Sequence, residues 1–438
     1  MTGAVPAGPF RIESLDHDGR GVARVDGKVT FVHGALPGEL VELELWRRKR
    51  SFDLAGVTRV VSASSQRVTA RCRHFERCGG CSLQHLEARA QVAIKQRVLE
   101  DALAHIGRLA PETMLASIHG PAWGYRHRAR FSVKHVARKG GALVGFHERR
   151  THYVVDMDSC EVLPAHVSAL IAPLRELVSG MRIVARLPQI DVAVTEDVTA
   201  LTLRVLDPPG PDDLAGMAQF AARHGVDIYL QPGGPDSIHP LDPAAARPLC
   251  YRLPEFGLAL HFRPSDFTQV NHAVNRVLVS RAVRLLQPRP GERIADLFCG
   301  LGNFTLALAR SGATVVGVEG SRDLVERGAQ NAQRNGVEGH AQFRRADLFE
   351  RSADVLSELG PLDAMLIDPP RDGAHALVQA LGSRGPTRLV YVSCNPATFA
   401  RDAAVLVTEK GYRLRAAGVV NMFPHTSHVE SVALFERG

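Results

Sequence analysis

The sequence lacks the features of an exported or membrane-spanning chain. It contains no run of about 18 uncharged apolar residues, the length that a membrane-spanning helix needs. Its first segment, MTGAVPAGPF, has neither the basic start nor the apolar core of a secretory signal. These absences predict a cytoplasmic protein that has no membrane partner.

Cysteine is scarce, with seven residues among 438, and the count is odd. In a chain that shows no export signal, a framework of disulfides is not expected. Metal binding or catalysis is then the better interpretation of the cysteines that occur in motifs. The sequence also shows no internal repeat, and its length allows two or three domains, each with its own core.

Positive charge is concentrated rather than spread evenly. The chain has 53 Lys and Arg against 46 Asp and Glu, a net charge of +7. One cluster, WRRKR, occupies residues 46–50, and a basic window between residues 121 and 153 contains a single acid, Glu148. The basic residues of this window are Arg126, Arg128, Arg130, Lys134, Arg138, Lys139, Arg149 and Arg150. Such clusters beside aromatic residues suit a nucleic-acid backbone, although a solvated face would look similar.

Three regions differ in pattern, which predicts a multidomain chain. Residues 1–67 contain short strands such as GKVTFVHGAL and ELVELEL, which predict a small OB-like β-barrel of a kind that often binds single strands. Residues 68–265 mix a helical stretch, ARAQVAIKQRVLEDALAHIG, with strand-like runs, as in an α+β domain. Residues 266–438 alternate strand, glycine turn and helix, which predicts a Rossmann-like α/β domain with a mostly parallel sheet.

The third region begins with a glycine turn, DLFCGLGN at 296–303, between a predicted strand and a helix. Gly300 and Gly302 permit a tight turn and let a ligand approach the backbone. Glu319 ends the next strand, where a carboxylate suits two hydrogen bonds from a ribose diol. This pattern alone would also fit a nicotinamide dinucleotide enzyme.

Acids at the ends of later strands favour a different cofactor. Asp347 follows the third strand, where it could meet an adenine amino group, and Asp368 stands before two prolines in IDPP at 367–370. No second phosphate-binding loop is present. This arrangement resembles that of S-adenosylmethionine-dependent methyltransferases. Arg371, rather than an aromatic residue, follows IDPP, so methylation of an exocyclic amine is less favoured.

Cys394 ends the strand RLVYVSC and should therefore open into the same cleft as Asp368. A free cysteine is usually buried in a core, but its position at a strand end favours a functional role. A thiolate that adds to carbon 6 of uracil turns carbon 5 into a nucleophile for a methyl-sulfonium group. The sequence therefore indicates methylation of carbon 5 of a pyrimidine.

That reaction also needs a base to remove the proton from carbon 5 after methylation. The segment NMFPHTSHVES at 421–431 offers Glu430, His425 and His428. We favour Glu430 because it interrupts a strand that otherwise consists of core residues.

Four motifs resemble those of the RNA 5-methyluridine methyltransferases: DLFCGLGNFTL, IDPPRDGA, YVSCNPATFARD and MFPHTSHVES. The resemblance covers the third region and implies that Cys394 is the nucleophile and Glu430 the base. It further implies contacts with S-adenosylmethionine from Gln269, Phe298, Asn303, Glu319, Asp347 and Asp368. Cys250 and Cys299 match no functional position and are expected to be structural.

The second region carries a cysteine motif. Cys72, Cys78 and Cys81 have C-x5-C-x2-C spacing, and Cys160 follows in DMDSC. Four thiolates can hold zinc or an iron–sulfur cluster, and the spacing leaves both open. Family members with this CGGC pattern carry a 4Fe-4S cluster and methylate 23S ribosomal RNA, which the resemblance implies here.

The N-terminal region resembles the TRAM module, a small RNA-binding barrel, and transfer RNA members are expected to lack both this barrel and the cysteines. The main hypothesis is thus a monomer that methylates carbon 5 of one uridine in 23S ribosomal RNA, turned out of its stack to be reached. One alternative is methylation of transfer RNA or of two ribosomal sites. The other is a non-catalytic iron–sulfur RNA-binding protein.

Overall fold

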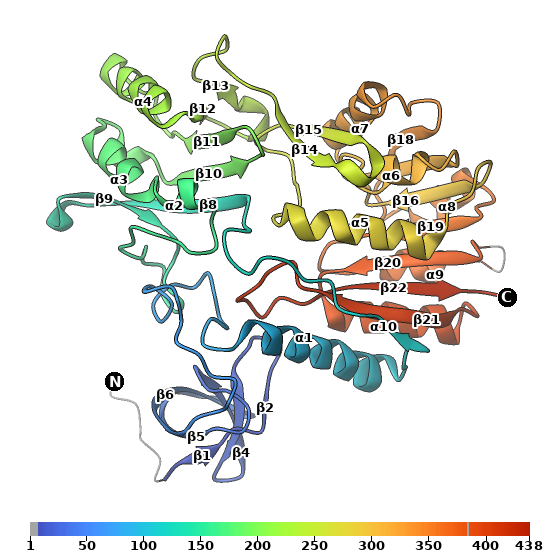
Figure 1. The fold of residues 1–438 in the computed structure, drawn as a ribbon, viewed down its shortest axis with the longest axis horizontal. Coiled ribbons are helices and arrows are strands. Elements are labelled where there is room, and N and C mark those ends of the chain that lie inside the picture. Colours follow the sequence, from blue (N-terminus) through green and yellow to red (C-terminus); the bar gives the residue numbers. More distant parts are fainter. Residues whose placement is uncertain (1–7, 383–384) are drawn as a thin grey trace.

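The computed structural model describes residues 8–382 and 385–438. Within these ranges the strands form two six-stranded sheets, one eight-stranded sheet and a two-stranded hairpin. Figure 1 shows a small N-terminal sheet at the bottom, a central sheet at the upper left and a larger C-terminal unit on the right. The multidomain organisation is confirmed. Residues 1–7 of the predicted barrel lie outside the described residues, and the boundaries after residues 67 and 265 remain predictions.

The N-terminal sheet has the strand order β1-β5-β6-β4-β3-β2. Its strands are β1 (Phe10–Arg11), β2 (Ser14–Leu15), β3 (Gly21–Val25), β4 (Lys28–His33), β5 (Leu40–Arg48) and β6 (Asp53–Ser62). Side chains alternate along β5, so that Val41, Leu43 and Leu45 are buried in a small core of this sheet alone. The strands expected over GKVTFVHGAL and ELVELEL are confirmed.

A buried ion pair between Glu39 and Arg67 links two segments of the N-terminal sheet. The Glu39 side chain is fully buried and accepts hydrogen bonds from Arg67 at 2.6 and 2.7 Å. Its carboxylate also accepts the backbone N–H groups of Leu36 and Ser64 at 2.8 and 3.1 Å. The carboxylate thereby joins the loop before β5 to the segment that leaves β6.

The central sheet has the order β13-β12-β11-β10-β8-β9. Its strands are β8 (Arg128–Val136), β9 (Gly141–Gly145), β10 (Gln189–Val194), β11 (Thr199–Arg204), β12 (Asp227–Gln231) and β13 (His239–Pro240). The helices of this part are α2 (Ala165–Ser168), α3 (Ile171–Gly180) and α4 (Pro211–His224). This part shares a core with Cys78 and Cys160, so the cysteine segment packs on it.

The C-terminal sheet has the order β18-β17-β16-β19-β20-β22-β21-β7. Its strands are β16 (Arg293–Leu297), β17 (Thr314–Glu319), β18 (Ala341–Arg345), β19 (Ala364–Ile367), β20 (Arg388–Ser393), β21 (Arg413–Val420), β22 (Glu430–Glu436) and β7 (Thr113–Met114). The first five strands in this order are parallel, and β22 runs antiparallel to β20 and β21. The mostly parallel α/β sheet is confirmed.

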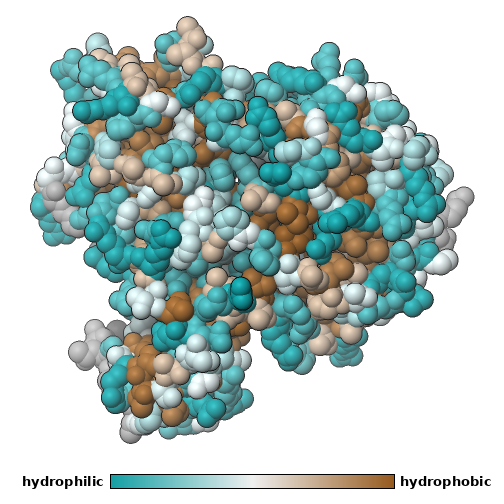
Figure 2. All heavy atoms as spheres, viewed as in Figure 1, coloured by the Kyte–Doolittle hydropathy of each residue, from teal (hydrophilic) through white to brown (hydrophobic). Residues whose placement is uncertain are grey.

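Helices lie on both faces of this sheet (Figure 1). They are α5 (His272–Leu286), α6 (Thr305–Ala309), α7 (Arg322–Arg334), α8 (Ser352–Leu359), α9 (His375–Ala380) and α10 (Pro396–Thr408). Every described helix falls short of the length and apolar character that crossing a bilayer requires. Figure 2 shows a mostly hydrophilic face with small hydrophobic patches, one of them at the centre, between the central and C-terminal parts.

Segments from earlier in the chain complete the C-terminal unit. Helix α1 (Ala88–Ala102) packs on β21 and α10, and β7 pairs with β21. The hairpin of β14 (Leu249–Leu253) and β15 (Leu258–Phe262) shares the core of this unit. Side chains on α1 and β14 can therefore reach a site at the ends of the parallel strands.

The ion pair in the N-terminal sheet yields a stability prediction. Glu39→Gln should lower the free energy of unfolding of this sheet by about 3 kcal/mol, because Arg67 is left without its carboxylate. Chemical denaturation followed by tryptophan fluorescence measures this, since Trp46 lies on β5. Glu42→Gln is the matched control, because its pair with Arg59 is exposed and should contribute little. Equal effects of the two variants would contradict the assignment.

Candidate active site

A cavity of about 650 Å³ lies where the parallel strands end. Ligands of such sheets bind at the carboxyl ends of the strands, where the side chains that follow each strand meet. All eight residues predicted for catalysis and cofactor binding line this cavity: Gln269, Phe298, Asn303, Glu319, Asp347, Asp368, Cys394 and Glu430. The structure thus brings the predicted site together, while the role of each residue remains a prediction.

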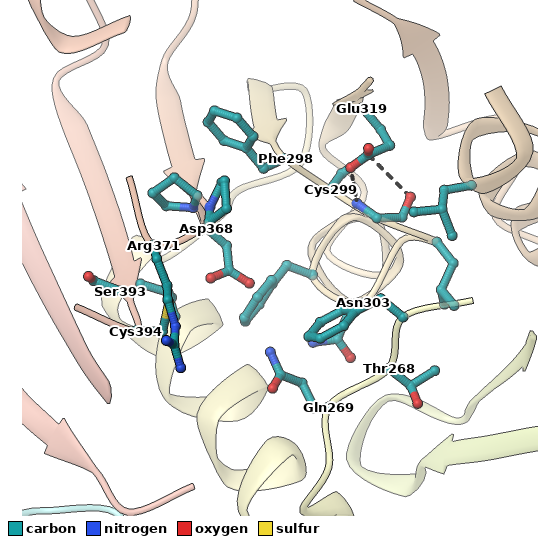
Figure 3. Close-up of a pocket in the computed structure, with 18 of the residues that line it drawn as sticks. Thr268, Gln269, Phe298, Cys299, Asn303, Glu319, Asp368, Arg371, Ser393 and Cys394 are labelled. Atoms are coloured by element: carbon teal, nitrogen blue, oxygen red, sulfur yellow. Dashed lines mark hydrogen bonds between the residues drawn. The ribbon is translucent and has the colours of Figure 1, made fainter. Parts of the chain in front are cut away.

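The glycine turn positions Glu319. Its Oε2 atom accepts the N–H of Gly300 at 3.1 Å, and its Oε1 atom accepts the N–H of Ser321 at 3.0 Å. Gly300 has a φ of 55°, in the left-handed region that glycine adopts without cost. The carboxylate is therefore fixed beside the turn, with lone pairs left for a vicinal diol (Figure 3).

Phe298 also adopts a left-handed conformation, with a φ of 64° that is strained for an aromatic residue. Its ring lies 5.5 Å from that of Phe349, at an angle of 56°. Asp347, two residues before Phe349, accepts the N–H groups of Phe349 and Glu350 with its Oδ1 atom at 2.8 and 3.2 Å. Two aromatic rings and a carboxylate therefore surround one end of the cavity, which suits a planar base with an amino group.

Asn303 is held by residues that the sequence analysis missed. Its Oδ1 atom accepts hydrogen bonds from Tyr251 on β14 at 3.0 Å and from Asn275 on α5 at 2.9 Å, while its Nδ2 atom donates back to Asn275 at 3.0 Å. Tyr251 and Asn275 stand in other segments, so no local motif indicates them. The amide of Gln269 has no hydrogen-bond partner within the described residues, and it points into the cavity in Figure 3.

Cys394 follows β20 directly. Asn395 caps helix α10 by accepting the N–H of Ala397 at 3.1 Å, and it donates to the carbonyl of Arg371 at 3.1 Å. These contacts hold the cysteine between a strand and a helix start, beside the Asp-Pro-Pro segment. Burial, together with the nearby Glu430 and Asp368, raises the pKa of Cys394 to about 11, and Arg371 opposes this increase. The thiol is therefore protonated at pH 7 unless positive charge comes close to it.

The two carboxyl groups nearest this thiol are themselves perturbed. Burial raises the pKa of Asp368 to about 7. Burial and repulsion from Asp368 raise the pKa of Glu430 to about 8. Glu430 is 7% exposed, and its Oε2 atom has no hydrogen-bond partner within the described chain. A carboxyl group that is close to neutral and unpaired can exchange a proton with a ligand in the cavity.

Lys95 on α1 is a further residue that the sequence analysis missed. It is 1% exposed and donates to the Asn421 side chain and the Phe423 carbonyl, both at 2.8 Å. These acceptors lie in the loop 421–429, which leads into Glu430. Burial lowers the pKa of Lys95 to about 7, while the charge of Glu430 raises it. The lysine therefore holds the loop and supplies the positive charge that opposes the rise in the pKa of Glu430.

The two histidines considered as alternatives to Glu430 have different places. His428 lines the cavity and lies 3.2 Å from Arg371. His425 does not line it: the ring is stacked on Trp123 with centroids 3.8 Å apart and contacts Gln91 at 3.1 Å. Burial lowers the pKa of His425 to about 4. His425 is therefore a structural residue of the loop.

The four cysteines of the second region form a linked group, in which Cys78 and Cys81 lie within electrostatic reach of both Cys72 and Cys160. All four are free, and burial raises the pKa of Cys81 to about 11 and of Cys160 to about 12. Arg149 donates to the carbonyls of Phe75 and Cys81 at 2.8 and 2.7 Å, which places a guanidinium beside the thiols. In the described part of the chain, no three or more His, Cys, Asp or Glu side chains converge as ligands of one metal ion.

Two arginines of the basic window have partners within the protein, and the RNA-binding role of the window remains a prediction. Arg128 donates to the carbonyls of Pro264 and Asp266, both at 2.8 Å, and Arg130 pairs with Asp191 at 2.8 Å. These side chains are therefore engaged within the protein. Arg149 and Arg150 lie beside the N-terminal sheet instead, and the side chain of Lys139 lies outside the description.

Comparison with known proteins identifies the family. Residues 256–438 match the tRNA (Uracil-5-)-methyltransferase family, and residues 11–52 match the TRAM domain. The 23S rRNA (uracil(1939)-C(5))-methyltransferase RlmD of Aromatoleum aromaticum is 61% identical over 97% of this chain and 99% of its own. That of Dechloromonas aromatica is 59% identical with the same coverage.

This chain belongs to the RlmD-type family of RNA uracil-C5 methyltransferases. Its C-terminal unit is a class I methyltransferase fold that uses S-adenosylmethionine, and its N-terminal sheet is a TRAM domain. The alternative of a nicotinamide enzyme is therefore wrong, while the place of the cofactor in the cavity remains a prediction.

A solved structure corrects one expectation about this family. The tRNA (uracil-54, C5)-methyltransferase of Pyrococcus abyssi, in complex with S-adenosyl-L-homocysteine, has a TM-score of 0.75 and 25% identity. The match covers 98% of this chain and 99% of that one. The expectation that transfer RNA enzymes lack the N-terminal barrel is therefore wrong for that protein. Domain composition alone does not separate the two substrates.

The electrostatics of the cavity predict how the rate depends on pH. If Glu430 accepts a proton, it must be ionised, so the rate of that step should rise about tenfold per pH unit up to about pH 8 and then level off. Lys95→Gln keeps an N–H donor but removes the positive charge, so the rising limb should move to higher pH. Rates measured from pH 6 to 9.5 test this, with Lys410→Gln as a control that does not line the cavity. An unchanged profile in Lys95→Gln would rule out the electrostatic role.

Proposed function

We propose that this chain methylates carbon 5 of one uracil in 23S ribosomal RNA, at the position that its relatives' names give as 1939. One observation carries the proposal. In a chain 61% identical to such an enzyme, a thiol, an unpaired carboxyl group and the cofactor-binding acids line a single cavity. S-Adenosylmethionine supplies an electrophilic methyl group there and leaves as S-adenosylhomocysteine.

Cys394 acts as the nucleophile. The thiol first releases its proton to solvent. The thiolate sulfur then forms a bond with carbon 6 of the uracil, and the electron pair of the ring double bond moves to carbon 5 and the neighbouring carbonyl. Carbon 5 then takes the methyl group from the sulfonium centre. Arg371 already lowers the pKa of the thiol, although the pKa stays raised, and the positive charge of a bound sulfonium centre would lower it further.

Glu430 completes the reaction as the base. It removes the proton from carbon 5, the electron pair restores the ring double bond, and the bond between carbon 6 and Cys394 breaks. The proton rests on a carboxyl group whose raised pKa suits it to hold a proton near neutral pH. Atoms balance, since the ring gains a methyl group in place of the hydrogen that Glu430 carries away.

The target uridine must be unstacked. Carbons 5 and 6 lie on the edge and face of the ring, and the thiol is half-buried in the cavity, so a base within a helix cannot reach it. We propose that the enzyme acts as a monomer in the cytoplasm on a single-stranded part of the RNA. Residues 1–67, 68–265 and 266–438 are proposed as its domains.

We propose that Cys72, Cys78, Cys81 and Cys160 hold a 4Fe-4S cluster. Cys78 and Cys160 are buried, Cys72 and Cys81 are partly buried, and the charges of these thiols influence one another. Four thiolates of this kind can hold a cluster of four iron atoms. The backbone N–H groups of Ser82 and Leu83, next to this motif, donate to the carbonyl of His425 at 2.9 Å each. Bound thiolates would therefore brace the loop that leads to Glu430.

Transfer RNA is a second candidate substrate, favoured by the solved Pyrococcus abyssi enzyme that spans the whole chain. The identity of 25% to that protein is far below the 61% to the ribosomal enzyme. A competition between unmodified transfer RNA and a 23S ribosomal RNA fragment, with labelled methyl donor, decides between them. The third possibility, a non-catalytic RNA-binding protein, has no observation in its favour.

The nucleophile is tested by Cys394→Ala. This variant should bind S-adenosylmethionine with unchanged affinity, measured by calorimetry, but transfer no methyl group to a 23S ribosomal RNA fragment. Cys250→Ala is the matched control, because that free cysteine lies on the hairpin outside the cavity. Glu430→Gln should slow turnover by about 10²- to 10⁴-fold and leave methylated RNA bound to Cys394. Substantial turnover by Cys394→Ala would overturn the mechanism.

The cluster is tested by metal content and colour. Chain purified without oxygen should contain about four iron atoms and absorb near 400 nm, as thiolate-bound iron does. Cys160→Ser should lose both, while Cys250→Ser should keep them. One zinc ion per chain with no visible absorption would show that the metal assignment is wrong.

A further inference from the structure

A second cavity, of about 1060 Å³, separates the N-terminal sheet from the cysteine segment. Strands β4, β5 and β6 line one side, and the segments 67–77 and 148–151 line the other. It shares no lining residue with the catalytic cavity. We call it the Trp46 groove, after its most prominent aromatic residue. Its volume is at the upper end for binding sites of small ligands, about 300–1,000 Å³.

A fixed aromatic platform stands in this groove. The ring of Trp46 lies across the backbone of β6 at Gly56, where a Cβ atom would overlap it. The His33 ring lies 5.2 Å away, and the Arg150 guanidinium lies 3.7 Å above the indole. Trp46 is nevertheless 36% exposed, so glycine and arginine hold a large ring in place at the surface.

The charge in the groove is not fully compensated. Arg59, Arg67 and Arg77 each pair with a carboxylate. Arg150 is exposed and pairs with no carboxylate among the described residues, and Arg149 donates to backbone carbonyls alone. The charge of Arg149 is also opposed by Glu76, which lines the groove. The Arg150 guanidinium therefore supplies the uncompensated positive charge of the groove, as a site for a polyanion requires.

His85 gives an independent sign of a ligand. It lines the groove, is 5% exposed, and has no hydrogen-bond partner on either ring nitrogen within the described chain. Burial and the nearby Arg67 and Arg149 lower its pKa to about 4, so the ring is neutral and offers one donor and one acceptor. Unpaired buried polar atoms are costly, and a base edge or ribose hydroxyl would satisfy both nitrogens.

The N-terminal sheet that lines the groove also contacts the catalytic loop. A Cβ atom on Gly19, in the turn before β3, would lie 3.2 Å from Ser427 and 3.0 Å from Leu83. The N-terminal sheet therefore touches both the loop that leads to Glu430 and the segment after Cys81. An RNA strand held in the groove would thus be held by a part in direct contact with the catalytic loop.

We propose that the Trp46 groove binds an unpaired stretch of the RNA substrate outside the target uridine, with one base stacked on the Arg150–Trp46 pair and a base edge or ribose on His85. The flat face of the guanidinium on the indole accepts another planar ring, and stacking of this kind requires an unpaired base. Trp46 from the WRRKR segment and Arg150 from the end of the basic window, which stand far apart in the sequence, meet in this site. The proposal rests on the proposed function in that the ligand is the same RNA.

The test compares RNA affinity with turnover. Trp46→Leu and Arg150→Gln should each raise the Kd for a labelled 23S ribosomal RNA fragment, and the KM for its methylation, by about tenfold, since stacking is lost. The kcat at saturating RNA should stay unchanged, because the groove shares no residue with the catalytic cavity. Trp46→Phe should recover most of the affinity. Arg24→Gln, an exposed arginine on β3 outside the groove, should bind as the wild type does.

The outcomes separate this proposal from the proposed function. An unchanged Kd for the RNA fragment in Arg150→Gln would overturn the proposal that the groove binds RNA. This holds for any result with Trp46→Leu, because the exposed Arg150 side chain is not needed for folding. Equal weakening by Arg24→Gln also overturns it, because the effect would then be one of general charge. If the wild-type chain binds the fragment tightly but never methylates it, the proposed function is wrong, while the proposal that the Trp46 groove binds RNA is not contradicted.

Discussion

The structure of the cavity depends on the electrostatic coupling between the thiol of Cys394 and the carboxyl groups of Asp368 and Glu430. Cys394, Asp368 and Glu430 share one cavity, and each negative charge there makes the next one harder to form. The site is therefore close to neutral when it holds no positive charge, and a sulfonium ligand would turn the thiol into a nucleophile. The positive charge of Lys95 opposes the rise in the pKa of Glu430. The methyl donor and the nucleophile are thus linked by charge as well as by position.

The loop 421–429 connects Glu430 to other parts of the fold. Its position between β21 and β22 places Glu430 at the start of an antiparallel strand beside β20, so that Glu430 lies close to Cys394. Three parts of the chain hold it: Lys95 on α1, the segment after Cys81 and the turn at Gly19. The N-terminal and central parts therefore help to position the loop that leads to Glu430, the proposed base.

Sequence patterns predicted the residues that stand at strand ends. Cys394 and Asp368 follow apolar strands directly, and a strand-end position is readable from local alternation of strand and turn. Lys95 was not predictable, because it contacts Asn421, 326 residues away, through a helix that carries no motif. Tyr251 was not predictable for the same reason, because it donates a hydrogen bond to Asn303 from a distant segment without a motif. The order of the sheet could be expected in outline, but the packing of α1 and the hairpin on it depends on contacts that no local pattern records.

The central claim is that a bond forms transiently between the sulfur of Cys394 and the target base. A 23S ribosomal RNA fragment with 5-fluorouridine at the target position tests it directly, since fluorine at carbon 5 cannot be removed as a proton and the adduct cannot resolve. After incubation with S-adenosylmethionine, mass spectrometry should find a methylated fluorouridine on the peptide that contains Cys394. Absence of any adduct, or an adduct on another residue, would contradict the account.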